Sequence, residues 1–202
     1  MTEKNVAAER TLLKMEDYLD LFKKSQALLE GHFLLTSGKH SAQYMQCAQV
    51  LQYPERAAIL AAGLAASFRD FEVQTVIGPA MGGILVAHEV AKALGVRALF
   101  TERENGIMRL RRGFTLAAGE RVLVVEDVIT TGGSVREVLA VVRELGAVPV
   151  GVGVLVDRSG GTVEFGLPQS SLLQLEIQAY EAEKCPLCAQ GIPAIKPGSR
   201  KV

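Results

Sequence analysis

The residues of this chain that could do chemistry gather most densely between positions 122 and 134. An apolar, β-branched run at residues 122–125 predicts a strand buried on both faces of a parallel sheet. Two carboxylates, Glu126 and Asp127, follow directly, and the small, hydroxyl-rich residues 130–134 lead into a helical pattern. A glycine-rich turn at a helix start presents free N–H groups and suits a phosphate. Because the carboxylates would repel a bare phosphate, the stretch indicates a phosphorylated sugar, whose hydroxyls or bound divalent metal they would contact.

The alternative is an ordinary strand–turn–helix, since glycine and threonine pairs are common in turns and acidic residues commonly cap helices. The full order is much rarer than either pair: an apolar run, Glu-Asp, two apolar residues, Thr-Thr-Gly-Gly-Ser and then a helix. That order favours the binding function.

Two further loops have a composition suited to phosphates. Residues 78–83, Gly-Pro-Ala-Met-Gly-Gly, could let the backbone approach a diphosphate, although a tight strand–helix turn would look the same. Residues 102–112 carry several guanidinium groups, which could close over a polyphosphate and neutralise a departing pyrophosphate. The alternative for this second loop is a solvated charged hairpin.

Asp157 and Arg158 follow the apolar run 148–156, and an arginine at a strand end can hold a carboxylate through two hydrogen bonds. A surface turn is the alternative, and composition alone favours it. The three histidines, at positions 32, 40 and 88, have no partner at metal or triad spacing, so a structural role is expected. Cys185 and Cys188 have zinc-knuckle spacing, but no second Cys or His pair follows. A plain or redox-sensitive turn is therefore expected there, unless two subunits share a metal site.

These loops need a scaffold, and the hydrophobic pattern predicts one. Helices are expected at residues 8–29, from 54 onward, and at 84–94 and 135–145; strands are expected at 33–36, 43–47, 73–77, 96–100, 121–125, 148–156 and 172–180. Strands that alternate with helices indicate an α/β, doubly wound, mostly parallel sheet flanked by helices. In such a sheet, ligands collect at the loops that follow the strand ends.

The chain is expected to be a single domain of 202 residues. It would comprise an N-terminal helix and small hood (about 1–50), an α/β core (about 53–180) and a polar tail (181–202). Positive and negative residues balance at 22 each, which gives no drive toward nucleic acid or anionic membrane. No apolar run approaches the ~20 residues that span a bilayer, and no signal-peptide core follows the start. Three cysteines argue against a disulfide framework, so a cytoplasmic location is expected.

Together, the four loops resemble the type I phosphoribosyltransferases, and the 126–134 segment, Arg158 and the early Leu35-Thr-Ser-Gly segment resemble the orotate-using branch of that family. The resemblance covers about residues 30–165 and implies that PRPP and orotate are the substrates. It implies that Glu126 and Asp127 bind the ribose hydroxyls, that residues 130–134 cradle the 5′-phosphate, and that Tyr44 lines the orotate pocket. The full PRPP-binding set that it implies is Glu126, Asp127, Val128, Ile129, Thr130, Thr131, Gly132, Gly133, Ser134, Ala80, Met81 and Gly82.

The same resemblance implies that Thr130 and Arg158 contact orotate and that Mg²⁺ arrives with PRPP rather than on protein ligands. It also implies a homodimer in which each flexible loop serves the partner's active site. The catalytic residues that it implies are Arg103, Arg109, Arg111, Arg112 and Asp127.

The chain departs from the family pattern where lysines are usual. It has no Lys or His between Phe100 and Phe114, and Thr36 and Gly82 stand where family members often carry lysine. Two other functions stay open: a purine or other base phosphoribosyltransferase, and a regulatory protein that senses PRPP and binds RNA or DNA. The balanced charge and the lack of a helix-turn-helix extension disfavour the regulator.

Overall fold

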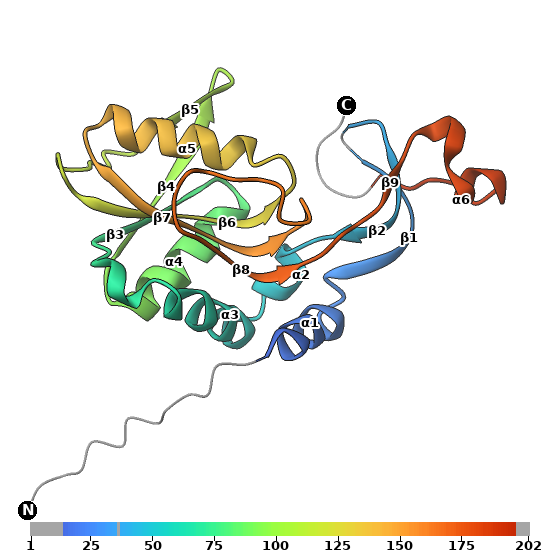
Figure 1. Ribbon diagram of the computed structural model, residues 1–202, viewed down its shortest axis with the longest axis horizontal. Helices are drawn as coiled ribbons and strands as arrows, with labels where there is room; N and C mark the ends of the chain where they lie inside the picture. Colours follow the sequence, from blue (N-terminus) through green and yellow to red (C-terminus); the bar gives the residue numbers. More distant parts are fainter. Residues whose placement is uncertain (1–13, 36, 197–202) are drawn as a thin grey trace, which may run out of the picture.

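The computed structural model describes residues 14–35 and 37–196, and its centre is a six-stranded sheet with the order β5-β4-β3-β6-β7-β8 (Figure 1). β3 (Thr75–Pro79), β4 (Arg97–Glu104), β6 (Arg121–Ile129), β7 (Val148–Asp157) and β8 (Gln169–Gln174) run parallel. β5 (Ile107–Leu110) joins β4 in antiparallel fashion at one edge. The predicted mostly parallel α/β sheet is confirmed.

Helices cover both faces of this sheet. α3 (Pro54–Ala66) and α4 (Gly82–Leu94) lie on one face, and α5 (Gly133–Glu144) lies on the other (Figure 1). The alternation along β6 explains why both faces are apolar: Leu123 and Val125 pack in the α3–α4 core, whereas Val122 and Val124 pack in the α5 core. The strand is thus buried on both sides, as predicted, and its polar end is fixed at the edge of the sheet.

A second, antiparallel sheet forms the hood. It consists of β1 (Leu28–Leu34), β2 (His40–Met45) and the two-residue β9 (Ala179–Tyr180). After β9 in the sequence, the chain forms two short helices, η2 (Ala182–Lys184) and α6 (Pro186–Ala189). It then returns to β1 through a bridge between Phe33 and Ile195. Residues 181–196 of the expected polar tail are therefore packed on the hood, to one side of the main sheet (Figure 1).

The N-terminal helix is shorter than predicted. α1 (Met15–Lys24) ends where the Ser25 hydroxyl donates to the Leu21 carbonyl and Gln26 adopts a left-handed φ of 53°. Leu28 and Leu29, which the helical spacing assigned to this helix, belong to β1, and residues 8–13 lie outside the described part of the chain. The spacing failed here because the apolar residues of a hairpin strand continued the helical period by chance.

The predicted strand at residues 172–180 is also wrong, since β8 and β9 belong to different sheets. Three smaller differences concern short elements: α2 (Ala48–Leu51) and η1 (Arg69–Phe71) were not predicted, and Thr36 lies outside the described residues. Within residues 14–35 and 37–196, no helix is both long and apolar enough to cross a membrane.

The charged segment 102–113 is a hairpin rather than an irregular loop. β4 continues to Glu104, and Asn105 and Gly106 turn the chain with φ values of 52° and 81°. β5 then pairs back, with Glu102 opposite Arg109. Opposite charges in directly facing positions stabilise such a pair, and this explains why a charged segment forms strands.

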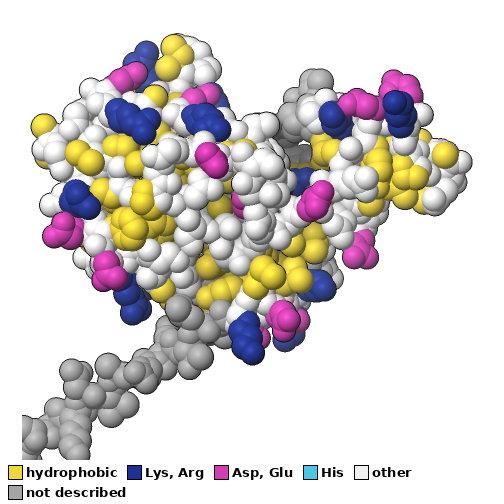
Figure 2. All heavy atoms as spheres, viewed as in Figure 1, with side chains coloured by type: hydrophobic (Ala, Val, Ile, Leu, Met, Phe, Trp, Pro, Cys, Tyr) yellow, Lys and Arg dark blue, Asp and Glu magenta, His cyan; other side chains and the backbone are white. Residues whose placement is uncertain are grey.

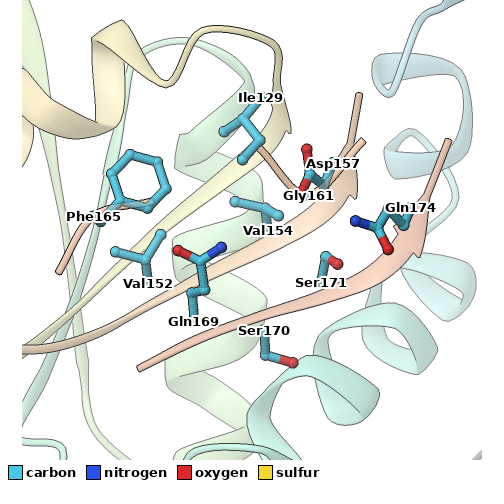
Figure 3. A pocket seen from close by; sticks show the side chains of 10 residues that line it. All are labelled: Ile129, Val152, Val154, Asp157, Gly161, Phe165, Gln169, Ser170, Ser171 and Gln174. Atoms are coloured by element: carbon cyan, nitrogen blue, oxygen red, sulfur yellow. The ribbon is translucent and has the colours of Figure 1, made fainter. Parts of the chain in front are cut away.

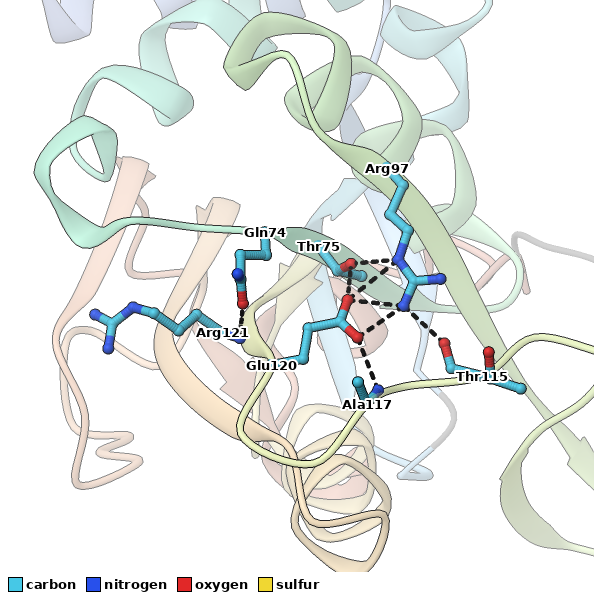
Figure 4. Close-up of polar contacts among 7 residues, drawn as sticks. All are labelled: Gln74, Thr75, Arg97, Thr115, Ala117, Glu120 and Arg121. Atoms are coloured by element: carbon cyan, nitrogen blue, oxygen red, sulfur yellow. Dashed lines mark hydrogen bonds and ion pairs between the residues drawn. The ribbon is translucent and has the colours of Figure 1, made fainter.

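A hydrogen-bond network joins the first residues of three strands at the end of the sheet opposite the turn at residues 105–106 (Figure 4). The Glu120 carboxylate accepts hydrogen bonds from the Arg97 guanidinium at 2.7 and 2.8 Å and from the Ala117 amide at 2.8 Å, and Thr75 donates its hydroxyl to the same group. Burial alone would raise the pKa of Glu120, but these hydrogen bonds lower that pKa below its ordinary value. The network therefore links β3, β4 and the start of β6.

Candidate active site

A cavity of about 280 Å³ opens where β6 ends and α5 begins. It is bounded by the predicted ribose-phosphate segment and by two charged side chains from elsewhere in the fold, one on β4 and one on α5. The lining residues are Glu126, Val128, Ile129, Thr130, Thr131, Gly132, Gly133, Ser134, Val135, Arg103 and Glu137. Glu137 was not predicted, because an acidic residue one helical turn into α5 carries no distinctive sequence signal.

The acidic pair lies near the C-terminal end of β6. Glu126 is only 8% exposed, and its carboxylate accepts a hydrogen bond from the Asp127 amide at 3.1 Å. The Asp127 carboxylate accepts one from the Val128 amide at 2.9 Å. Burial, and then the charge of Asp127, raise the pKa of Glu126 well above its usual range; burial likewise raises the pKa of Asp127. A buried carboxylate beside a half-buried one gains from a ligand that brings hydroxyl donors or a cation.

The start of α5 is built to hold an anion. Gly132 precedes the helix with a φ of 72°, and no side chain caps the free N–H groups of the first turn. A Cβ atom at Gly132 would stand 2.8 Å from both Phe165 and Val163, so both the backbone and the space require glycine. The exposed N–H groups and the helix dipole therefore face the cavity, as a phosphate site needs.

The glycine-rich segment after β3 lies against the acidic pair. A Cβ atom added to Gly82 would clash with the Asp127 carboxylate, so the two loops are in direct contact. The Ala80 amide donates to the Thr101 carbonyl at 2.7 Å, and the Ala80–Met81 peptide bond is cis. Met81 is 83% exposed. Ala80, Met81 and Gly82 are thus beside Asp127, where the resemblance expects the diphosphate.

The four hairpin arginines have different surroundings. Arg103 lines the cavity, with its guanidinium 2.8 Å from the Glu137 carboxylate. The other three pair with acidic residues of their own hairpin. Arg109 lies 3.8 Å from Glu104, Arg111 lies 2.9 Å from Glu104, and Arg112 lies 2.9 Å from Glu102. Among the described residues, only Arg103 of the four lines the cavity.

Arg158 follows β7 directly beside the end of β6, since its amide donates to the Ile129 carbonyl at 2.9 Å. Its Nε atom is buried and has no hydrogen-bond partner within residues 14–35 and 37–196. Burial lowers the pKa of Arg158, and the nearby Tyr44 and Cys47 oppose that change. Tyr44 comes from β2 of the hood, so hood and core meet at this guanidinium. A half-buried guanidinium with an unpartnered Nε suits a carboxylate ligand.

Cys47 is a neighbour that sequence analysis did not single out. Its thiol is buried and lies 3.8 Å from the Asp127 carbonyl oxygen. Burial, followed by the charges of Asp127 and Glu126, raises the pKa of this thiol well above its ordinary value. Cys47 is therefore a protonated packing group below the acidic pair rather than a nucleophile.

Asp157 has a structural role in the turn that follows β7. Its carboxylate accepts a hydrogen bond from the Ser159 amide at 2.7 Å, which fixes the turn that follows β7. It also borders a second cavity, of about 220 Å³, over β7 and β8 (Figure 3). Gln169 and Gln174 of β8 bring polar groups to this cavity, and Ile129 borders both cavities.

The fold and the site together define a protein of the phosphoribosyltransferase class, with a ribose-phosphate cradle at the carboxyl edge of a parallel sheet. The model of the phosphoribosyl transferase domain matches residues 46–165. The chain is 60% identical to an orotate phosphoribosyltransferase of Desulforamulus reducens over 190 residues, which are 94% of this chain and all of the relative. It is 55% identical to the Caldanaerobacter subterraneus subsp. tengcongensis enzyme of that name, with the same coverage.

Among solved structures, the orotate phosphoribosyltransferase of Aeropyrum pernix is 30% identical, with a TM-score of 0.62 over 78% of this chain and 93% of that one. The Mycobacterium tuberculosis enzyme in complex with inorganic phosphate is 26% identical, with a TM-score of 0.63 over 79% of this chain and 96% of that one. The chain belongs to the orotate phosphoribosyltransferase family.

Proposed function

We propose that this protein transfers the 5-phosphoribosyl group of PRPP to orotate and so forms orotidine 5′-monophosphate and pyrophosphate, a step of de novo UMP synthesis. The observation that carries the proposal is the half-buried Arg158 side chain, whose buried Nε has no partner among the described residues, beside a ribose-phosphate cradle. Relatives at 53–60% identity are named for the orotate reaction.

In this proposal the donor is held by the motif that follows β6. The first-turn amides of α5 and the Thr130, Thr131 and Ser134 side chains bind the 5′-phosphate, while Glu126 and Asp127 accept hydrogen bonds from the ribose hydroxyls. Neighbouring carboxylates with raised pKa values, one buried and one half-buried, fit a ligand that also brings Mg²⁺, which prefers oxygen ligands. When bound, Mg²⁺ would neutralise charge on the diphosphate.

The acceptor is orotate, whose carboxylate pairs with Arg158. Its ring is held near Tyr44 and Thr130. The bond from the anomeric carbon to the diphosphate oxygen breaks with both electrons going to pyrophosphate. The orotate ring nitrogen supplies the electron pair of the new C–N bond, and its proton passes to the departing pyrophosphate or to solvent. This chemistry requires no protein nucleophile. Positioning, electrostatic stabilisation of the leaving group and exclusion of water supply the acceleration.

The hairpin arginines serve the leaving group. Arg103 borders the cavity of its own chain, and Arg109, Arg111 and Arg112 lie further along the same hairpin. We include in the proposal a cytoplasmic homodimer in which these three residues reach the partner's site.

Two alternatives are less well supported. A purine base has no carboxylate for Arg158, and the similarity to adenine phosphoribosyltransferase structures, at 17% identity, concerns the fold alone. A PRPP-sensing regulator that binds nucleic acid would need a basic surface. On the face drawn in Figure 2, Lys and Arg side chains are interspersed with Asp and Glu.

The test is a comparison of acceptor bases. Pyrophosphate release would be measured with PRPP and Mg²⁺ and with orotate, uracil, adenine or hypoxanthine supplied separately. Of the four bases, only orotate is expected to give pyrophosphate release. Uracil is the matched control because it differs from orotate only in lacking the carboxylate. Release with a purine but not with orotate would replace the proposed acceptor, and no release with any base would refute the transferase activity.

A further inference from the structure

Four potential metal ligands converge in the hood, well apart in sequence from the motif at 126–134. His32 lies on β1 and His40 on β2, while Cys185 and Cys188 flank the start of α6. One nitrogen from each histidine and the two sulfur atoms all lie within 4.8 Å of one another. The hairpin pairing explains half of this arrangement, since Leu34 is opposite His40 and brings both histidines to the same end of the sheet.

The separations are those of ligands around one small ion. With Zn–N bonds of about 2.0–2.1 Å and Zn–S bonds of about 2.3 Å, tetrahedral ligand atoms stand about 3.3–3.8 Å apart. Cys185 Sγ lies 3.4 Å and Cys188 Sγ 3.7 Å from His32 Nε2, and Cys188 Sγ lies 3.2 Å from His40 Nδ1. The two ring nitrogens are closer, at 2.8 Å, and a small rotation of the half-buried His40 ring would open this edge.

His32 is already oriented as a metal ligand. Its Nδ1 lies 2.6 Å from the Ile192 carbonyl oxygen and is placed to donate its proton there. That tautomer leaves the Nε2 lone pair directed at the two sulfur atoms. A histidine that donates its other ring N–H to a carbonyl is the usual partner arrangement for metal-bound imidazole. Because His32 is only 2% exposed, packing also fixes the ring.

We propose that His32, His40, Cys185 and Cys188 bind a single zinc ion within one chain. Two thiolates and two imidazoles in a tetrahedron favour zinc over magnesium or calcium, which prefer oxygen ligands. All four positions would be filled by protein, so the ion would be structural rather than catalytic. The site is independent of the proposed transferase activity.

The site would add a further link to a segment that is held on the hood by the β9–β2 pairing, the Phe33–Ile195 bridge and the Lys39–Glu181 ion pair. β9 has two residues, η2 three and α6 four, and this C-terminal segment reaches the hood from the far end of the chain. Among residues 181–196, Cys185 is the only buried side chain, at 3% exposure. A metal clip that closes a long loop stabilises such a segment by restricting the unfolded chain.

Two other arrangements would bring the same atoms together without a metal. Cys185 and Cys188 could be joined as a disulfide, or His40 could donate a hydrogen bond to His32 beside two free thiols. Both leave the protein free of zinc, so metal content distinguishes them from the proposal.

The experiment is a metal analysis of the full-length protein, purified with a thiol reductant and without a metal-affinity column. We expect about one zinc ion per chain by mass spectrometry. Replacement of zinc by Co²⁺ should give the visible bands of tetrahedral cobalt together with thiolate charge-transfer absorption. Cys188→Ser and His40→Asn should each lose most of the metal, whereas the matched controls Cys47→Ser and His88→Asn should keep it.

Three results would overturn the proposal. The first is a wild-type protein that is free of zinc and gives no tetrahedral cobalt spectrum. The second is an intact mass, measured without reductant, that shows a Cys185–Cys188 disulfide in the purified protein. The third is full zinc content in both Cys188→Ser and His40→Asn. The wild-type measurements need no variant, so a variant that fails to fold does not remove the test.

Discussion

Gly82 shows how a single residue can be fixed by its neighbour. No left-handed backbone requires glycine there; instead, a Cβ atom would clash with the Asp127 carboxylate. The same contact leaves no room for a side chain at position 82. The Asp127 carboxylate occupies the space that a side chain would need, and Asp127 belongs to the acidic pair that is proposed to hold the ribose.

We therefore expect Gly82→Ala to displace the Asp127 carboxylate and lower kcat/KM for PRPP by about 10²-fold, the cost of misplacing a binding group by about 1 Å. Steady-state kinetics would measure the loss, and thermal unfolding would show whether the fold is kept. A folded Gly82→Ala protein with wild-type kinetics would contradict the close contact.

At the scale of elements, the strand–loop–helix unit formed by β6 and α5 carries the donor site, and the β4–β5 hairpin carries the cations. Within the hairpin, Arg103 is beside the cavity, while Arg111 and Arg112 are held by Glu102 and Glu104. Arg103 is also ion-paired, at 2.8 Å from Glu137, but it alone of the four is already beside the cavity among the described residues, so the hairpin arginines should not contribute equally.

Arg103→Ala is expected to lower kcat by about 10²-fold, comparable to the loss of one transition-state hydrogen-bond donor. Arg109→Ala, on the same hairpin and 3.8 Å from Glu104, is the matched comparison and should have a smaller effect. Single-turnover rates with saturating PRPP and orotate would measure both. Equal effects of the two substitutions would contradict a special place for Arg103.

The Glu120 network predicts a pH dependence of stability. The pKa of Glu120 is lowered in the folded state, so its ionised form stabilises the fold above the unfolded value near 4.5. This contribution is lost as the pH falls below that value and through the lower folded pKa. Glu120→Gln should therefore destabilise the protein by about 1.5–3 kcal/mol at neutral pH.

Urea unfolding at several pH values would measure this free energy. The difference between wild type and Glu120→Gln should shrink as the pH falls below the ordinary glutamate range. Glu144→Gln, at an exposed end of α5, is the control and should change the free energy by less than about 0.5 kcal/mol. A difference that stays constant with pH would show that the ionised carboxylate is not the stabilising form.

The sequence predicted most of the core elements because period and turn chemistry are local properties. α3, α4, α5 and the strands between them follow from apolar runs bounded by Pro54, Gly95 and Gly146. The hood could not be predicted in the same way, since β9 pairs with β2 across more than a hundred residues. His32 and Cys185 are far apart in the sequence, and they are brought together by that long-range pairing and by the bridge between Phe33 and Ile195.

The same distinction between local pattern and long-range contact applies to the candidate site. The cradle at 126–134 is contiguous, so its motif predicted its members together. The contact between Gly82 and Asp127 and the proximity of Tyr44 to Arg158 depend on how separate elements meet. Their residues were expected from family resemblance, and no local pattern could have supplied the contacts.

At the scale of the whole molecule, the protein has an α/β core with helices on both faces of its sheet, and a hood that approaches this core near Arg158. Arg103 faces the cavity of its own chain, whereas Arg109, Arg111 and Arg112 are not among the residues that line it. The proposed homodimer assigns these three to the partner's site. Sharing of this kind makes each site depend on two subunits.

Mixed dimers would test the sharing. Arg111→Ala and Asp127→Asn should each be nearly inactive alone, and a refolded equimolar mixture should recover up to about a quarter of wild-type activity, because half of the dimers are hybrids with one intact site. Light scattering would establish the dimer. No recovery from a mixture that is dimeric would mean that the hairpin serves its own chain.

The central claim is that one pocket holds PRPP at the start of α5 and the acceptor carboxylate on Arg158. The most direct measurement is the kinetics of Arg158→Gln, with both substrates varied and Arg69→Gln as a distant control. Loss of the charged partner should lower kcat/KM for orotate by about 2–5 kcal/mol, or about 30- to several-thousand-fold, while the KM for PRPP stays near that of wild type. An unchanged kcat/KM for orotate, or an equal loss for both substrates, would contradict the account.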